Sequence, residues 1–71
     1  MAHVERRDGR RAIENALDAL NGYTITINYK DTNRASVSGV LSHDKGGNPL
    51  LSVDGGPPRA VDPSEIESVD F

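Results

Sequence analysis

The chain has 71 residues and a mass of 7.6 kDa, so we expect one domain with a small core. Because it has no cysteine, it can form neither disulfides nor thiolate metal sites. Its net charge of −3 argues against a general polyanion-binding protein. Because the sequence has neither an apolar run long enough for a membrane span nor a signal-peptide core, we expect a cytoplasmic protein without membrane contact.

Charge is distributed unevenly along the chain. Residues 1–11 carry four arginines and two acidic residues, whereas residues 12–71 carry four basic and nine acidic residues. We expect a flexible basic arm over residues 1–8 and a single domain over residues 9–71. The clustered arginines are Arg6, Arg7, Arg10 and Arg11. They are candidates for binding phosphates or an acidic protein surface, and the alternative is a solvated, frayed terminus.

Residues 9–20 have the pattern of an amphipathic helix. Its apolar stripe consists of Ile13, Ala16, Leu17 and Leu20. Asp8 is a suitable N-cap, and Gly22 provides a stop because glycine tolerates the left-handed conformation.

The period changes to two at residue 23, which predicts a half-buried strand over residues 23–30. Tyr23 and Tyr29 share its apolar face, so we place both in the core or at its edge. A polar turn leads to a second strand over residues 35–43, where Gly39 indicates a bulge or a sharp bend.

Shorter segments complete the predicted domain. Loops with turn-forming residues separate strands over residues 49–53, 59–62 and 66–71, and a single helical turn over residues 63–65 precedes the last strand. Strands this short must curl to bury one face. We therefore predict a mostly β fold, in which an N-terminal α-helix is followed by a five-stranded antiparallel small barrel of the Sm-like or SH3-like kind.

Catalytic and cofactor-binding patterns find little support. His3 and His43 are far apart in sequence, and neither has a metal-ligand spacing. The neighbouring pair of His43 and Asp44 lacks an evident nucleophile and pocket. The glycine pairs at residues 46–47 and 55–56 lack the lysine and the following helix of a phosphate-binding loop, so hairpin turns explain them. We expect no enzyme activity, no cofactor and no metal site.

Residues 20–51 resemble the first signature segment of Sm-like proteins. The matching residues are Leu20-Asn21-Gly22, Ile25, Ile27, Gly39-Val40-Leu41, Asp44, Asn48 and Leu51. The second signature is half present, because residues 66–69 fit the final strand whereas Asp62 and Pro63 stand where the family has Arg-Gly. Similar barrels occur in the C-terminal domain of ribosome maturation factors, in WYL domains and in the small anti-Rho protein Rof.

The resemblance implies specific roles for the loop at residues 44–48. Asn48 would contact an RNA base and Asp44 would orient the loop, whereas the family's base-stacking arginine has no counterpart. Sm-like proteins also build rings through the edges of their fourth and fifth strands. A homo-oligomer is therefore an option for this chain, although Pro57 and Pro58 remove hydrogen-bond donors from one such edge.

Two functions follow from these patterns. The first is a non-enzymatic small-barrel binding module that regulates RNA or transcription machinery, with RNA or a protein of that machinery as its partner. Its contacts would come from the clustered arginines together with Asp44, Lys45 and Asn48. The second is an adaptor or inhibitor that binds a basic, nucleic-acid-binding protein. Its acidic face would consist of Asp62, Glu65, Glu67 and Asp70.

Overall fold

The computed structural model describes residues 2–71 and confirms a mostly β fold with one helix. Helix α1 (Ala12–Ala19) is accompanied by two short 3₁₀ turns, η1 (Arg6–Asp8) and η2 (Pro63–Glu65). The strands are β1 (His3–Glu5), β2 (Thr24–Tyr29), β3 (Val37–His43), β4 (Pro49–Ser52), β5 (Arg59–Ala60) and β6 (Ile66–Asp70). They form one antiparallel sheet in the order β1-β6-β2-β3-β4-β5. The sheet thus has six strands rather than five, and its two edges do not pair with each other within the described residues.

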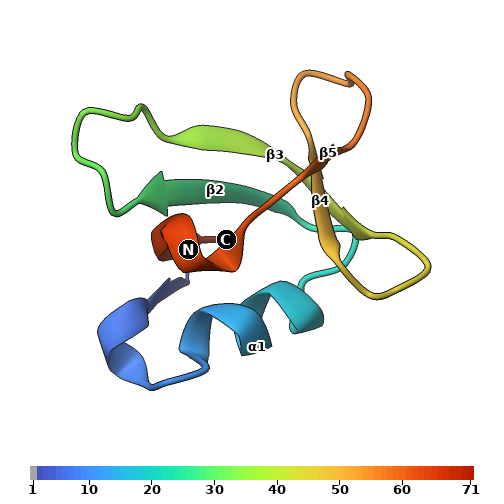
Figure 1. The fold of residues 1–71 in the computed structure, drawn as a ribbon. Coiled ribbons are helices and arrows are strands. Elements are labelled where there is room, and N and C mark those ends of the chain that lie inside the picture. The colour runs from blue at the N-terminus through green and yellow to red at the C-terminus, as the bar shows by residue number, and fades with distance from the viewer. Residues whose placement is uncertain (1) are drawn as a thin grey trace.

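The sixth strand comes from the segment expected to be a flexible arm. Met1 lies outside the described residues, but His3–Glu5 pair with β6, and Val4 stands opposite Val69 and packs against the core. Ala2 and Phe71 exchange backbone hydrogen bonds, so the two ends of the described chain lie side by side (Figure 1). The arm prediction therefore differs from the structure. One apolar residue between two polar ones is too short a pattern to indicate a strand, and its pairing partner lies at the other end of the sequence.

Helix α1 covers one side of the sheet with the predicted apolar stripe (Figure 1). The buried core consists of Ile13, Leu17, Leu20, Ile25, Ile27, Leu41, Leu51, Ile66 and Val69. The helix begins at Ala12 rather than near residue 9, because Asp8 belongs to η1 and its Oδ2 accepts a hydrogen bond from the backbone N–H of Glu5 (2.8 Å). Tyr29 packs against the core as predicted, but Tyr23 is 57% exposed, so its assignment to the core was wrong.

Gly39 lies where β3 changes partners. Residues 37–40 of β3 pair with β2, and residues 40–43 pair with β4. A Cβ atom at Gly39 would collide with the carbonyl oxygen of Ser52 and lie 2.9 Å from its carbonyl carbon. The missing side chain therefore lets β4 cross close to β3, as Figure 1 shows, and this agrees with the bend predicted there.

The loop after β4 turns back through the expected tight turn. Asp54 and Gly55 both have positive φ angles, 53° and 72°, and the N–H of Gly56 donates to the carbonyl oxygen of Val53 (2.9 Å). Two successive left-handed residues in an Asp-Gly pair characterise the hairpin turn whose twist matches that of paired strands.

Candidate functional site: an acidic groove

A groove of about 520 Å³ lies between the Asp44–Asn48 loop, the β4–β5 hairpin and η2. Its apolar wall includes Tyr29, Leu50 and Val61. Its polar lining consists of Arg34, Asp44, Asn48, Asp62 and Glu65. The groove therefore combines apolar surface with several carboxylates.

A second hollow of about 270 Å³ continues this groove toward α1. The two share three lining residues, Asn48, Pro49 and Pro63. The second hollow adds Glu14 and Asp18, which lie one helical turn apart on α1, and also Arg11. We call the two hollows together the acidic groove.

Carboxylates dominate the acidic groove. They are Glu14, Asp18, Asp44, Asp62 and Glu65, and the cations are Arg11 and Arg34. Five negative and two positive charges give its lining a net charge of −3. One of the cations is already paired, because Nη1 of Arg34 donates to Oε2 of Glu65 (2.6 Å).

Asp44 is held rigidly by its own loop. Its Oδ1 accepts hydrogen bonds from the backbone N–H groups of Gly46 and Asn48 (2.9 Å each), and its Oδ2 accepts one from Nδ2 of Asn48 (3.1 Å). The bonds from Asn48 and Gly46 lower the pKa of Asp44, so it stays ionised at neutral pH. Asp44 thus organises the loop, whereas Lys45 is exposed in it.

Asp62 has a similar structural task at the other side of the groove. Its Oδ1 accepts hydrogen bonds from the Ser64 hydroxyl (2.7 Å) and from the Ser64 backbone N–H (3.0 Å), which caps η2. These bonds lower the pKa of Asp62. Both carboxylates are therefore preorganised in the charged form.

Sequence reasoning missed the aromatic part of the groove. The guanidinium carbon of Arg34 lies 3.7 Å from the centroid of the Tyr29 ring, and the same side chain pairs with Glu65. In the sequence alone, Arg34 is an isolated basic residue in a polar turn. Its proximity to Tyr29 arises only because the loop after β2 folds back over that strand. A cation five residues after a strand aromatic is the only signal the sequence offers.

The four clustered arginines do not act as one group in the structure. The Arg6 side chain is hydrogen-bonded within the chain, since its Nε donates to the carbonyl oxygen of Ile66 (2.9 Å) and its Nη2 donates to the carbonyl oxygen of Pro63. Arg7 pairs with Glu5. Arg10 is exposed, and Arg11 lines the acidic groove. Only some of the clustered arginines are therefore available to a ligand without loss of a bond within the chain.

The proposed acidic face is divided as well. Asp62 and Glu65 line the groove, whereas Glu67 lines a separate hollow of about 230 Å³ beside Glu5 and Arg7. Asp70 belongs to a polar network on the outer face of the sheet and accepts a hydrogen bond from Nδ2 of Asn28 (2.9 Å).

His3 connects this network to the edge strand. Its Nδ1 contacts Oδ1 of Asp70 (2.5 Å) and its Nε2 contacts Oε1 of Glu5 (3.0 Å). Hydrogen bonding to Asp70, followed by that to Glu5, raises the pKa of His3, and His3 in turn lowers the pKa of Asp70. Because both ring nitrogens are engaged by carboxylates, neither is placed to activate a nucleophile.

The edge of the last strand, which the Sm-like resemblance implies for ring assembly, is paired with β1. At the opposite edge, β5 has two residues and follows Pro57 and Pro58. Within residues 2–71 no helix has both the length and the apolar character needed to cross a membrane. Comparison with protein-family models, curated proteins and solved structures found no match to this chain.

Proposed function

We propose that this protein is a non-enzymatic binding module whose acidic groove binds an arginine- or lysine-containing segment of a partner protein. The observation that carries the proposal is the groove itself, in which five carboxylates face two cations beside an apolar wall. Such a surface raises the local concentration of cationic ligands and repels phosphates.

The chemistry of arginine and lysine suits both parts of the groove. Their aliphatic stems cover apolar surface while the charged heads reach carboxylates. Leu50 and Val61 supply apolar surface, and Asp44 and Asp62 supply carboxylates that the loop and η2 already hold in place. Because these groups are preorganised, binding costs little further ordering of this chain.

We further propose that the domain is an open variant of the small barrel predicted from the sequence. Two features support this assignment. β3 divides its pairing between β2 and β4 around Gly39, and a single 3₁₀ turn separates β5 from β6. Both are ways to curl a short sheet around one core.

The test measures binding of a short peptide of alternating arginine and glycine by fluorescence anisotropy. The Glu14→Gln, Asp18→Asn double variant removes two groove charges from helix α1, at one half-buried and one exposed position, without disturbing a hydrogen bond given above. Exposed ion pairs contribute about 0.2–1 kcal/mol each, so the loss of two should weaken binding by roughly twofold to thirtyfold. Added salt should weaken wild-type binding further.

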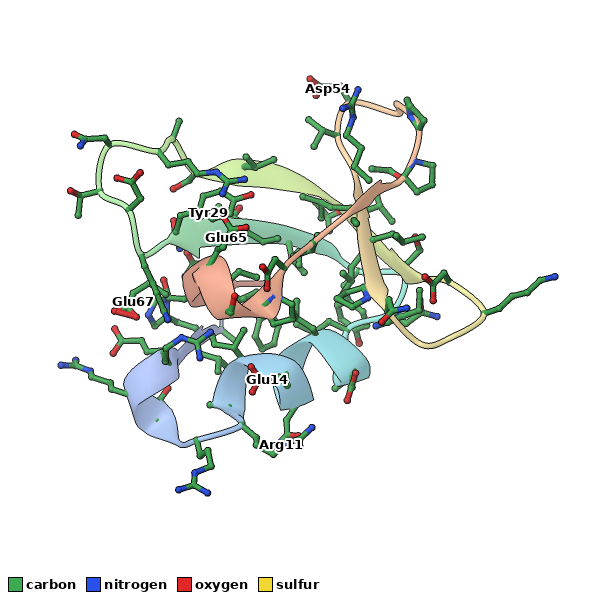
Figure 2. All side chains as sticks on the ribbon, viewed as in Figure 1. Arg11, Glu14, Tyr29, Asp54, Glu65 and Glu67 are labelled. Atoms are coloured by element: carbon green, nitrogen blue, oxygen red, sulfur yellow. The ribbon has the colours of Figure 1, made fainter. Side chains whose placement is uncertain are left out.

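The matched control is the Asp54→Asn, Glu67→Gln double variant, which removes the same charge outside the groove. Asparagine tolerates the left-handed conformation of residue 54. Figure 2 shows Asp54 far from Arg11 and Glu14. We expect the control to bind like the wild type. Equal weakening in both double variants would mean that net charge alone drives binding, and it would overturn the groove assignment.

RNA binding is the second candidate, because Arg7 and Arg10 are exposed and Arg7 has an 85% exposed side chain. It predicts salt-dependent binding of single-stranded RNA that is lost in the Arg7→Ala, Arg10→Ala, Arg11→Ala variant. That result, together with no binding of the arginine peptide, would replace the proposed function with RNA binding.

A further inference from the structure

We propose that Tyr29 and Glu65 form a guanidinium-binding subsite of the acidic groove, and that Arg34 of the same chain occupies it until an arginine of the partner takes its place. This inference rests on the proposed function and specifies which ligand group the groove recognises. Figure 2 shows Tyr29 and Glu65 close together beside η2.

The bound side chain reveals the chemistry of the subsite. The Arg34 guanidinium lies 3.7 Å from the Tyr29 ring centroid and also donates to Oε2 of Glu65 (2.6 Å). An aromatic face combined with a carboxylate satisfies both the flat surface and the N–H donors of a guanidinium. The subsite therefore already holds the functional group that we assign to the partner.

Arg34 also divides the space around Tyr29. Both residues line the groove of about 520 Å³ and two further hollows of about 260 Å³ and 200 Å³. If the Arg34 side chain turned toward solvent, the face of the Tyr29 ring would open to the groove. An incoming side chain would then reach Tyr29 and Glu65 from the acidic side.

Displacement of Arg34 requires no unfolding. The side chains of Arg34 and Glu65 are 48% and 52% exposed, and exposed ion pairs of this kind contribute little to stability. Arg34 belongs to the loop between β2 and β3, where its backbone N–H donates to the carbonyl oxygen of Asp31 (3.0 Å). That backbone bond can persist while the side chain moves.

Charge selects an arginine of a protein over a stacked RNA base. A base on the Tyr29 ring would bring its phosphates close to a groove that also contains Asp44 and Asp62. A peptide arginine instead brings positive charge to a groove whose lining has a net charge of −3. Lysine matches the charge but has no planar group to stack on the ring.

The experiment compares wild type, Arg34→Ala and Arg10→Ala for binding to the arginine–glycine peptide and to its lysine counterpart. Arg10→Ala is the matched control, because it removes the same charge from an exposed residue that lines none of the hollows described above. Removing the internal competitor should tighten binding of the arginine peptide about fivefold relative to this control. The preference for arginine over lysine should increase in Arg34→Ala and disappear when Tyr29→Leu is added. Thermal unfolding checks that each variant is folded, and Glu65→Gln provides a second way to weaken the subsite.

The outcomes separate this inference from the proposed function. If wild type binds the peptide and Arg34→Ala gains no more than Arg10→Ala, the subsite inference fails while the groove proposal stands. If neither wild type nor Arg34→Ala binds either peptide, the proposed function fails as well. If the Arg34→Ala change strengthens binding of single-stranded RNA instead, the subsite takes bases and the arginine assignment is overturned.

Discussion

Substitution of Gly39 by alanine tests the close approach of β4 to β3 at this position. The added Cβ would lie 2.9 Å from the carbonyl carbon of Ser52 and 3.1 Å from Cγ of Leu51, whereas ordinary contact begins at 3.4 Å. The backbone of β4 would therefore have to retreat by more than about 0.5 Å, the difference between 3.4 and 2.9 Å, because the carbonyl oxygen of Ser52 lies closer to the added Cβ than its carbonyl carbon does. Overpacking of this kind typically costs about 1–3 kcal/mol, and we expect about 3 kcal/mol because the obstacle is backbone held in a sheet.

A loss of this size should be easy to measure in so small a domain. Proteins of this length have roughly 4–11 kcal/mol of total stability, and 1 kcal/mol shifts the melting temperature by about 4–8 °C. Urea unfolding followed by circular dichroism gives the free energy of unfolding for the wild type and for Gly39→Ala.

The matched control is Gly9→Ala. No atom lies within 4 Å of a Cβ built at Gly9, and its φ angle of 164° is extended backbone that any residue adopts. Alanine there should leave stability unchanged or raise it by up to about 1 kcal/mol, because it restricts the unfolded chain. If Gly39→Ala stayed within about 0.5 kcal/mol of the wild type, or if both variants lost equally, the close approach of β4 would not limit this position.

Three further predictions concern the N-terminal segment and the core. Arg6→Ala should lower the free energy of unfolding by about 1.5–3 kcal/mol, because it removes charged hydrogen bonds to two backbone carbonyl groups. The control Arg10→Ala should leave the free energy of unfolding unchanged. Equal values for the two variants in urea unfolding would mean that Arg6 is not anchored. The pKa of His3 is raised by its contacts with Asp70 and Glu5, so these contacts stabilise fully below about pH 6.5 and are lost as the pH rises through the higher folded-state pKa. The wild type should therefore lose stability relative to His3→Gln as the pH rises above about 6.5, and parallel profiles would contradict this. Ile27→Ala should cost about 2–5 kcal/mol because Ile27 is fully buried, whereas Val40→Ala, at a position 45% exposed, should cost far less in the same assay.

Local patterns in the sequence were sufficient for most of the fold. The apolar stripe of α1, the alternation at Ile25 and Ile27, and the turn at Asp54 and Gly55 depend on neighbours within a few residues, and each occurs in the structure as expected. Gly39 was also informative, because an isolated glycine in a strand pattern usually indicates close backbone approach.

The misplaced elements depend on partners that are distant in the sequence. β1 forms because its residues pair with β6, where Val4 lies opposite Val69. Arg6 donates to the carbonyl oxygen of Ile66, which is sixty residues away in the sequence. No short pattern encodes such pairings. Tyr23 fits the alternation, but it precedes β2 and is left exposed there.

The candidate site was recoverable only in part, for the same reason. The resemblance to Sm-like proteins indicates Asp44 and Asn48, and charge indicates Asp62 and Glu65; all four line the groove. Their convergence with Tyr29 and Arg34 requires the β4–β5 hairpin and η2 to fold against the loops after β2 and β3, and this is a property of the whole sheet.

The pairing of the charges is the reason why we propose the groove, rather than the basic cluster, as the binding surface. Arg6 and Arg7 are already bonded within the chain, so a phosphate would have to compete with Ile66 and Glu5 for them. Competition of this kind reduces the energy gained from an incoming anion. Two of the groove carboxylates, Asp44 and Asp62, are stabilised differently, because they accept hydrogen bonds from backbone N–H groups of their own loops, which carry no positive charge. In the proposed mode of binding, a cation that enters the groove meets two carboxylates, Asp44 and Asp62, that are already held in place in the charged form, and at Glu65 it replaces a cation of the chain itself.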